Sequence, residues 1–354
     1  MKTIQNWWAN IDRFNLIFII SLGFTGLILS FSTNESFFVN RHFIFFTFSF
    51  FILLFLSSFD DQNIKRLSLF GFIIFLFLMI IIILLDYEVK GAKRWIQIYN
   101  FTLQPSEIIK PMFVILTSLC ISKSIDGHKF YLTVLILSFL LILFLLLLQP
   151  DLGMSILVSA TFFCQLFIAG LSAYLVIMAL LFITFFSVIS YFVFDHVQSR
   201  INSFLGGVGG SDTYQIDLSL LAFKSGGIFG KGPGQGILKE KIPDANTDFI
   251  FAVAGEELGY IFCLMIIILI LSIIVRTLLN VLKNKNPYKI IAISGLICLF
   301  GLQRLINIFS SLGLIPTKGM TLPFVSYGGS SLVSSAMIIS FILILIGLAT
   351  LKLR

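Results

Sequence analysis

Charged residues are scarce in this chain. Asp, Glu, Lys and Arg make up 12% of its 354 residues, about half of the share that soluble domains carry. Hydrophobic residues make up 58%, and the mean hydropathy is +1.04. This composition excludes a soluble globular protein and predicts an all-α polytopic membrane protein. The net charge of +7 is spread over the connections without a dense basic run, so we expect no nucleic-acid partner.

Cysteine and histidine are equally rare. The four cysteines lie inside apolar runs without metal or redox spacing, as expected of small buried side chains. The three histidines are far apart in the sequence, so we predict no metal site built from these residue types. A cleavable signal is missing as well, because Arg13 is followed by about twenty apolar residues and no small-residue cleavage site. This segment is therefore predicted to be the first membrane span.

Ten apolar runs approach the length of about twenty residues that a transmembrane helix needs. We expect about ten transmembrane helices in a single integral-membrane domain, residues 1–354. One long polar, glycine-rich loop, residues 195–248, separates the seventh span from the eighth. The predicted spans are 14–33, 42–59, 68–86, 105–122, 130–149, 152–171, 173–194, 249–275, 288–312 and 330–351.

Lysine and arginine in the short connections predict the orientation. With the N-terminus inside, twelve of these residues fall on the inner side and five on the outer side. Cytoplasmic loops carry such an excess of lysine and arginine. Both termini are therefore predicted to be cytoplasmic. Three segments then share the outer face, namely 87–104, the long loop 195–248 and 313–329.

Two groups of polar residues fall inside predicted spans, where they are costly. Glu107 and Lys110 are three residues apart on one helix face and can form an ion pair. Gln303 and Asn307 share a face of the ninth span, while Arg304 points elsewhere. We expect these three residues to make hydrogen bonds between helices.

Asp248 stands where the long polar loop meets the eighth span. It is either a functional carboxylate or an acid that caps the helix, because Asn, Thr and Asp in sequence are typical of a helix start. Glu256 and Glu257 follow about two turns later, so one of them is expected on the same helix face as Asp248.

Cations and glycines gather in the three outer segments. Lys93 and Arg94 lie beside Trp95, which suits either a lipid phosphate or plain membrane anchoring. Lys231 lies in the run SGGIFGKGPGQG, which is no nucleotide P-loop, but whose amides could cradle a phosphate; a flexible loop is the alternative. Lys318 and Tyr327 lie in a proline- and glycine-broken entry to the last span, which is tolerated where the backbone lines a cavity. Together they indicate a pocket for a large anionic lipid.

In this order, the motifs resemble those of the SEDS family (shape, elongation, division and sporulation) of bacterial peptidoglycan polymerases. The resemblance covers nearly the whole chain. Within the family, the PTKGMTLPFVSYGG form resembles the cell-division branch FtsW more than the elongation branch RodA. The motifs are GAKRWI at 91–96, QPSEIIK at 104–110, QPDLG at 149–153, DTYQ to SGG at 212–227, TDFIFAVAGEELG at 247–259 and PTKGMTLPFVSYGGSSL at 316–332.

The resemblance implies a function and its residues. Family members polymerise lipid II, an undecaprenyl-pyrophosphate disaccharide-pentapeptide, and the TDF carboxylate, here Asp248, is catalytic. Glu107 and Lys110 then form the ion pair of the central cavity. Family members often have His where Asn246 stands, which puts a proton-carrying role of that position in doubt. The residues nominated to bind the substrate are Lys93, Arg94, Arg200, Lys231, Lys318 and Tyr327.

Partners and location follow from the same resemblance. We expect a class B penicillin-binding protein as the cross-linking partner, other division proteins, membrane lipids, and a bacterial inner-membrane location at the septum. A divalent cation, Mg²⁺ or Mn²⁺, could share the neutralisation of pyrophosphate, although no multi-carboxylate ligand set is evident. Two alternatives stay open at this point, a lipid II flippase and a scaffold for other division proteins.

Overall fold

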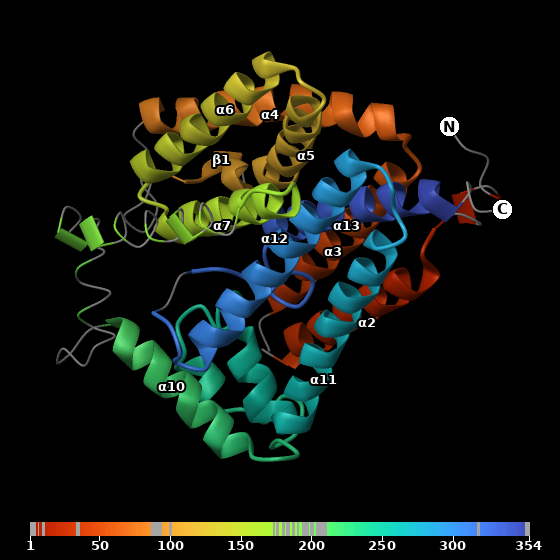
Figure 1. The fold of residues 1–354 in the computed structure, drawn as a ribbon. Helices are drawn as coiled ribbons and strands as arrows, with labels where there is room; N and C mark the ends of the chain where they lie inside the picture. The colour runs from red at the N-terminus through yellow and green to blue at the C-terminus, as the bar shows by residue number, and fades with distance from the viewer. Residues whose placement is uncertain are drawn as a thin grey trace.

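A computed structural model describes residues 11–32, 36–85, 94–98, 101–172, 211–316 and 319–350, with isolated positions between 5 and 8 and between 174 and 202. Nearly all of these residues are helical, which confirms the all-α prediction (Figure 1). The described part also contains a short antiparallel hairpin of β1 (Ile96–Ile98) and β2 (Phe101–Leu103), in which Ile96 pairs with Leu103.

Eight of the described helices are long and apolar enough to cross a membrane. A ninth apolar helix, α7 (Leu152–Ile168), has 17 residues. Nine of the ten predicted spans are thus helices, and the predicted span 173–194 lies outside the described residues except at isolated positions. The eight are α2 (Arg13–Ser32), α3 (Ser36–Ser57), α4 (Asp61–Leu85), α5 (Pro105–Ile125), α6 (Lys129–Leu148), α11 (Ile250–Val281), α12 (Pro287–Ser311) and α13 (Gly329–Thr350).

Three predicted boundaries were wrong by six or seven residues, about two helical turns. The second span begins at Ser36 instead of residue 42, and the eighth ends at Val281 instead of residue 275. We expected the third span to begin at residue 68, but α4 begins at Asp61. The polar residues before the apolar run continue the helix, and Lys65 supports this first part through a contact of 3.4 Å with Asp61, one turn earlier.

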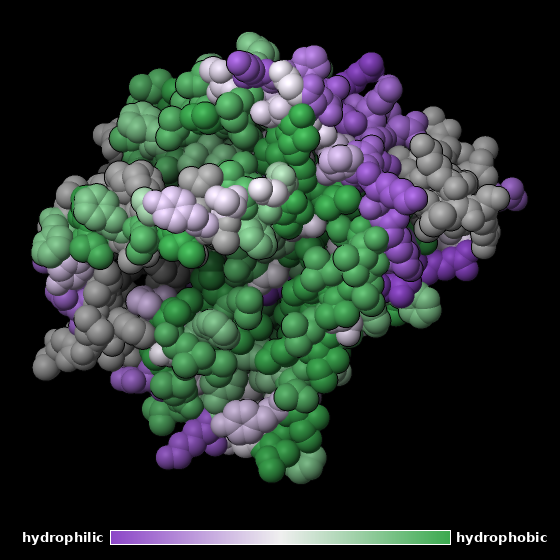
Figure 2. All heavy atoms as spheres, viewed as in Figure 1, coloured by the Kyte–Doolittle hydropathy of each residue, from purple (hydrophilic) through white to green (hydrophobic). Residues whose placement is uncertain are grey.

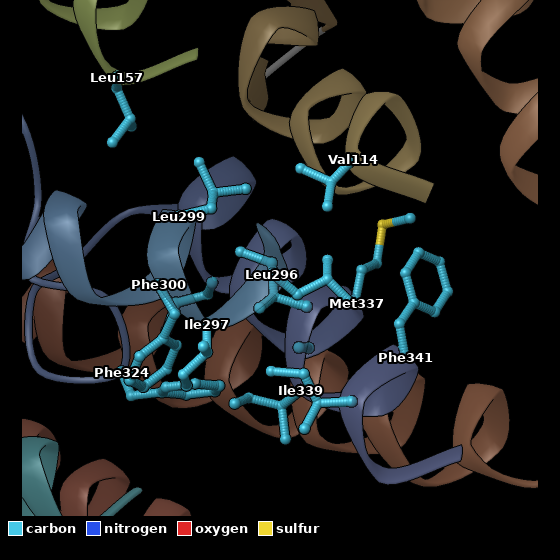
Figure 3. Close-up of a cluster of buried hydrophobic side chains, with 14 of the residues drawn as sticks. Val114, Leu157, Leu296, Ile297, Leu299, Phe300, Phe324, Met337, Ile339 and Phe341 are labelled. Atoms are coloured by element: carbon cyan, nitrogen blue, oxygen red, sulfur yellow. The ribbon is translucent and has the colours of Figure 1, made fainter. Parts of the chain in front are cut away.

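The helices differ in how deeply they are buried. Helices α5, α12 and α13 form the centre, with 72% of the spanning window buried in α5 and α12 and 89% in α13. By contrast, 28% is buried in α4 and α6, which lie at the periphery in Figure 1. In Figure 3, Val114 of α5, Leu296 of α12 and Met337 of α13 point toward one another in this centre.

The surface has the polarity of a membrane protein. Figure 2 shows hydrophobic side chains over most of the visible face, whereas hydrophilic side chains gather on the side where both chain ends lie in Figure 1. The chain is therefore an integral membrane protein.

The long loop has structure of its own. It contains α10 (Ser211–Gly226) and a short 3-10 helix, η1 (Leu238–Glu240), and α10 packs along α11. Helix α11 is broken at Gly259, whose φ of 79° and ψ of −179° are non-helical. This conformation is essentially restricted to glycine.

Candidate active site

Asp248 lies at the end of a tight turn rather than at the helix cap. Helix α11 begins at Ile250 and its N-cap residue is Phe249, so the alternative of Asp248 as the N-cap was wrong. The main-chain NH groups of Thr247 and Asp248 each donate to the carbonyl oxygen of Asp244 at 3.0 Å. Asp244 has a φ of 56°, which a short polar side chain tolerates better than most. Asp248 itself is half-buried.

Asn307 fixes the main chain at Asp248. Its amide nitrogen Nδ2 donates to the carbonyl oxygen of Asp248 at 2.8 Å and to that of Met320 at 2.5 Å. Asn307 belongs to the core helix α12 and is 1% exposed. It therefore anchors two segments to α12, the one that precedes α11 and the one that precedes α13. Both donors of the side-chain amide are used in this way.

The segment before α13 adjoins the same carboxylate. A Cβ atom at Gly319 would lie 3.5 Å from Asp248 Oδ2. The NH of Tyr327 donates to the carbonyl oxygen of Asn246 at 2.9 Å, so the predicted substrate-binding residue Tyr327 belongs to a segment that contacts the Asp248 turn. Three stretches that are distant in sequence therefore meet at Asp248, from the long loop, from α12 and from residues 319–327.

The predicted ion pair is present. Lys110 Nζ lies 2.8 Å from Glu107 Oε2 and 3.0 Å from Gln303 Oε1. Lys110 is 1% exposed and Glu107 is 6% exposed, so both charges are removed from water. Since Gln303 and Asn307 lie one turn apart on α12, the ion pair and Asp248 are held by the same helix face.

The prediction of hydrogen bonds between helices for the ninth span is correct for Gln303, which accepts from Lys110 of α5. Asn307 bonds to main-chain oxygens of the segments that precede α11 and α13 rather than to another helix. Arg304 instead donates from Nη1 to the carbonyl oxygen of Phe300 in its own helix at 2.6 Å, and its guanidinium lies 3.1 Å from the centre of the Phe300 ring.

The predicted cations that the structure describes are bonded within the protein. Arg94 donates to the carbonyl oxygens of Gln149 and Pro150, and its Nη1 lies 3.7 Å from Asp151 Oδ1. It therefore braces the QPDLG turn, where Asp151 caps α7 by accepting from the NH of residue 154 at 3.3 Å. Three further nominated residues, Lys93, Arg200 and Lys318, lie outside the described residues.

Sequence reasoning missed a compact arrangement around Glu256 and Glu257. Both carboxylates are 0% exposed and turn toward the glycine-rich connection between α10 and α11, where five main-chain amides donate to them at 3.0–3.3 Å. Lys231 and Lys239 pair with Glu256 and Glu257 at 3.0 and 2.8 Å. Of the amides that we considered for a phosphate, those of Gly234 and Gly236 thus donate to a carboxylate of the same chain. Those of Lys231 and Gly232 donate to the main-chain oxygens of Glu256 and Glu257. The sequence signal for this arrangement was a glycine-rich run about twenty residues before two adjacent acids.

In the part of the chain that the structure describes, no group of three or more His, Cys, Asp or Glu side chains is placed to hold a metal ion.

Known proteins are similar to this chain over nearly its whole length. The model of the family described as "cell cycle protein", which groups FtsW, RodA and SpoVE, matches residues 2–349. A probable peptidoglycan glycosyltransferase FtsW of Caulobacter vibrioides is 36% identical over 353 residues, covering 96% of this chain and 90% of the relative. A protein of the same name from Borreliella burgdorferi is 34% identical over 328 residues, covering 90% and 88%.

Solved structures share the fold. A chain of a peptidoglycan synthase complex, described as coordinating polymerisation and crosslinking, superposes with a TM-score of 0.81 at 20% identity and covers 95% of this chain and 97% of its own. The rod shape determining protein RodA of Thermus thermophilus superposes with a TM-score of 0.69 at 22% identity, covering 95% of this chain and 96% of its own.

Proposed function

This chain belongs to the cell cycle protein family that groups FtsW, RodA and SpoVE, and on that basis we propose that it is a peptidoglycan glycosyltransferase that polymerises lipid II during cell division. The names of its curated relatives support the enzyme class and the FtsW branch. The geometry that carries the proposal is the Asp248 turn, in which a carboxylate is held between α12 and the segment before α13.

Asp248 is the proposed general base. In the proposed reaction, the C4 hydroxyl of a lipid II GlcNAc attacks the anomeric carbon of the growing chain. The hydroxyl proton passes to the Asp248 carboxylate, the new glycosidic bond forms with inversion, and undecaprenyl pyrophosphate leaves with the electrons of the broken bond. General-base assistance of this kind is worth about 10² to 10⁴ in rate.

The leaving pyrophosphate needs positive charge. Lys93, Arg200 and Lys318 are proposed for this task, and Tyr327 is proposed as a further substrate contact. Arg94 and Lys231 were nominated on the same grounds, but their bonds to the QPDLG turn and to Glu256 favour a structural role. The buried ion pair of Glu107 and Lys110 is proposed to stabilise the face of α12 that holds Asp248, through the contact of Lys110 with Gln303.

The cellular setting completes the proposal. We infer a bacterial inner-membrane protein with both termini cytoplasmic and the Asp248 side facing outward, at the division septum. A class B penicillin-binding protein is the proposed cross-linking partner, which agrees with the synthase complex whose chain shares this fold. Residues 1–354 are proposed to form one membrane domain.

Incubation of purified protein with labelled lipid II, with and without the proposed partner, tests the function. We expect glycan strands that migrate as a ladder on a gel. Transport of lipid II across vesicle membranes without any polymer would instead identify a flippase, and the absence of both activities would leave the scaffold as the better explanation.

A further inference from the structure

The main-chain amides of the connection between α10 and α11 are bonded within the protein. Nine of residues 230–239 carry a main-chain NH, since residue 233 is proline. Two of these NH groups donate to oxygens of residues 226 and 232, two donate to the main-chain oxygens of Glu256 and Glu257, and five donate to the carboxylates of the same two residues. All nine are therefore satisfied inside the protein.

For the NH groups, this pattern meets the requirement that lipid imposes on irregular backbone. Water satisfies the amides of a loop in solution, so such a loop has no need to bond every NH group internally. At membrane depth no water is available, and irregular backbone is tolerated only where the protein itself supplies the partners. Two buried glutamates at the base of a glycine-rich loop supply them here.

The charges of the same region are also neutralised. Glu256 and Glu257 pair with Lys231 and Lys239, so the four groups together carry no net charge. Ser32 at the end of α2 donates to Glu257 and accepts from Lys239 through its main-chain oxygen. Paired charges of this kind are the form in which ionisable residues are found inside membranes.

The connection exposes three large apolar side chains, together with the polar residues Lys231 and Gln235. Ile228, Phe229 and Ile237 are 61%, 80% and 63% exposed. In Figure 1 this connection lies beside the lower end of α11, and in Figure 2 the lower edge carries hydrophobic side chains together with hydrophilic ones. Large exposed apolar side chains favour a contact surface over a loop in solvent.

This surface continues into the lipid-facing side of a membrane span. The carbonyl oxygens of Gly227 and Ile228 accept from the NH groups of Tyr260 and Ile261 at 3.0 and 3.3 Å. These bonds place residues 227 and 228 against the first turn of α11 after its break. Ile261 and Leu264 are 55% and 60% exposed there. From Tyr260 to its end at Val281 the helix has 22 residues, about 33 Å in length, which is enough to cross the hydrocarbon core.

We propose that residues 226–239 form a re-entrant loop seated in the bilayer, with Ile228, Phe229 and Ile237 in contact with lipid acyl chains. The continuity with the exposed face of α11 identifies the occupant as lipid. The two glutamates serve this loop as internal acceptors, which explains why two adjacent carboxylates are both buried.

Depth measurements with a fluorescent label test the proposal. The four native cysteines are replaced by alanine, single cysteines are introduced as F229C and I237C, and the labelled proteins are reconstituted in nanodiscs. L264C, on the exposed face of α11, is the lipid reference. K285C, in the exposed connection between α11 and α12, is the water reference. Nitroxide lipids and aqueous Co²⁺ are the quenchers, and thermal unfolding confirms that each variant is folded.

We expect labels at 229 and 237 to match L264C, with blue-shifted emission, strong quenching by nitroxide lipids, and several-fold less quenching by Co²⁺ than K285C. Emission and Co²⁺ quenching like those of K285C would overturn the proposal, because the loop would then lie in water. Protection from both quenchers would overturn it too, because protein would then cover the labelled positions 229 and 237. None of these readouts depends on catalytic activity.

Discussion

The side-chain amide of Asn307 donates to the main-chain oxygens of both Asp248 and Met320, at 2.8 and 2.5 Å. One buried side chain on α12 therefore sets the position of the proposed base and of the segment that adjoins it. The carboxylate of Asp248 has to be placed accurately for proton transfer, because misplacement by about 1 Å can cost about 10²-fold in rate.

Asn307→Asp is expected to reduce polymerisation strongly. The side chain keeps its size but replaces a donating amide with an accepting carboxylate, which faces two carbonyl oxygens. The main chain at Asp248 then loses its support, and we expect kcat to fall while KM changes less. Steady-state kinetics on lipid II measure both constants.

Gln165→Glu is the matched control for that variant. Gln165 is a fully buried amide on α7 that donates to Val114 O and Ser118 Oγ at 2.9 and 2.6 Å, and it supports the packing of α7 on α5. Both variants lose buried hydrogen bonds, worth about 1–3 kcal/mol each. Equal activity per folded molecule in the two variants would contradict a positioning role for Asn307.

Glu257→Gln is expected to destabilise the protein by about 3–5 kcal/mol, the usual cost of leaving one partner of a buried ion pair alone. The partner is Lys239, 2.8 Å away and 6% exposed. Thermal unfolding in detergent measures the loss. The double variant with Lys239→Met removes the orphan charge and is expected to recover part of the stability; a single variant as stable as the wild type would show that this pair is unimportant.

Gly259→Ala is expected to prevent correct folding of the α10–α11 region. Gly259 has a φ of 79°, and a Cβ atom there would lie 2.4 Å from both Gly230 N and Ile228 O. Gly127→Ala is the control, because Gly127 also has a positive φ, 94°, but no atom within 4 Å of the added carbon. We expect the control to lose about 1–2 kcal/mol from backbone strain alone, measured by thermal unfolding. Equal losses in the two variants would rule out the close approach as the cause.

Lys110→Met is expected to cost about 3–5 kcal/mol, because it leaves the carboxylate of Glu107 buried without its cation. The double variant with Glu107→Gln removes the unpaired charge and is expected to be more stable than Lys110→Met alone. If thermal unfolding showed Lys110→Met to be more stable than the double variant, the unpaired charge of Glu107 would not be the cause of the loss.

Sequence patterns predicted the helices and the pairs formed within one helix, and they missed contacts between distant segments. Glu107 and Lys110 are three residues apart, so helix geometry alone places them together. Glu256 and Glu257 contact a loop that precedes them by about twenty residues, and only the folded chain shows that its amides turn inward. Arg94 was nominated for a phosphate, yet its partners belong to a turn more than fifty residues later. The sequence likewise did not predict the partners of Asn307, although it predicted that Asn307 shares a helix face with Gln303.

Polymerisation of labelled lipid II by the Asp248→Asn variant tests the central claim most directly. Asparagine has nearly the shape of aspartate but cannot accept the proton as a carboxylate does, and the main-chain bond to Asn307 does not involve the side chain. We predict an unfolding temperature like that of the wild type and a loss of polymer formation by about 10² to 10⁴, with Asp248→Ala equally inactive. Glycan strands formed by a folded Asp248→Asn protein at the rate of the wild type would contradict the assignment of Asp248 as the general base.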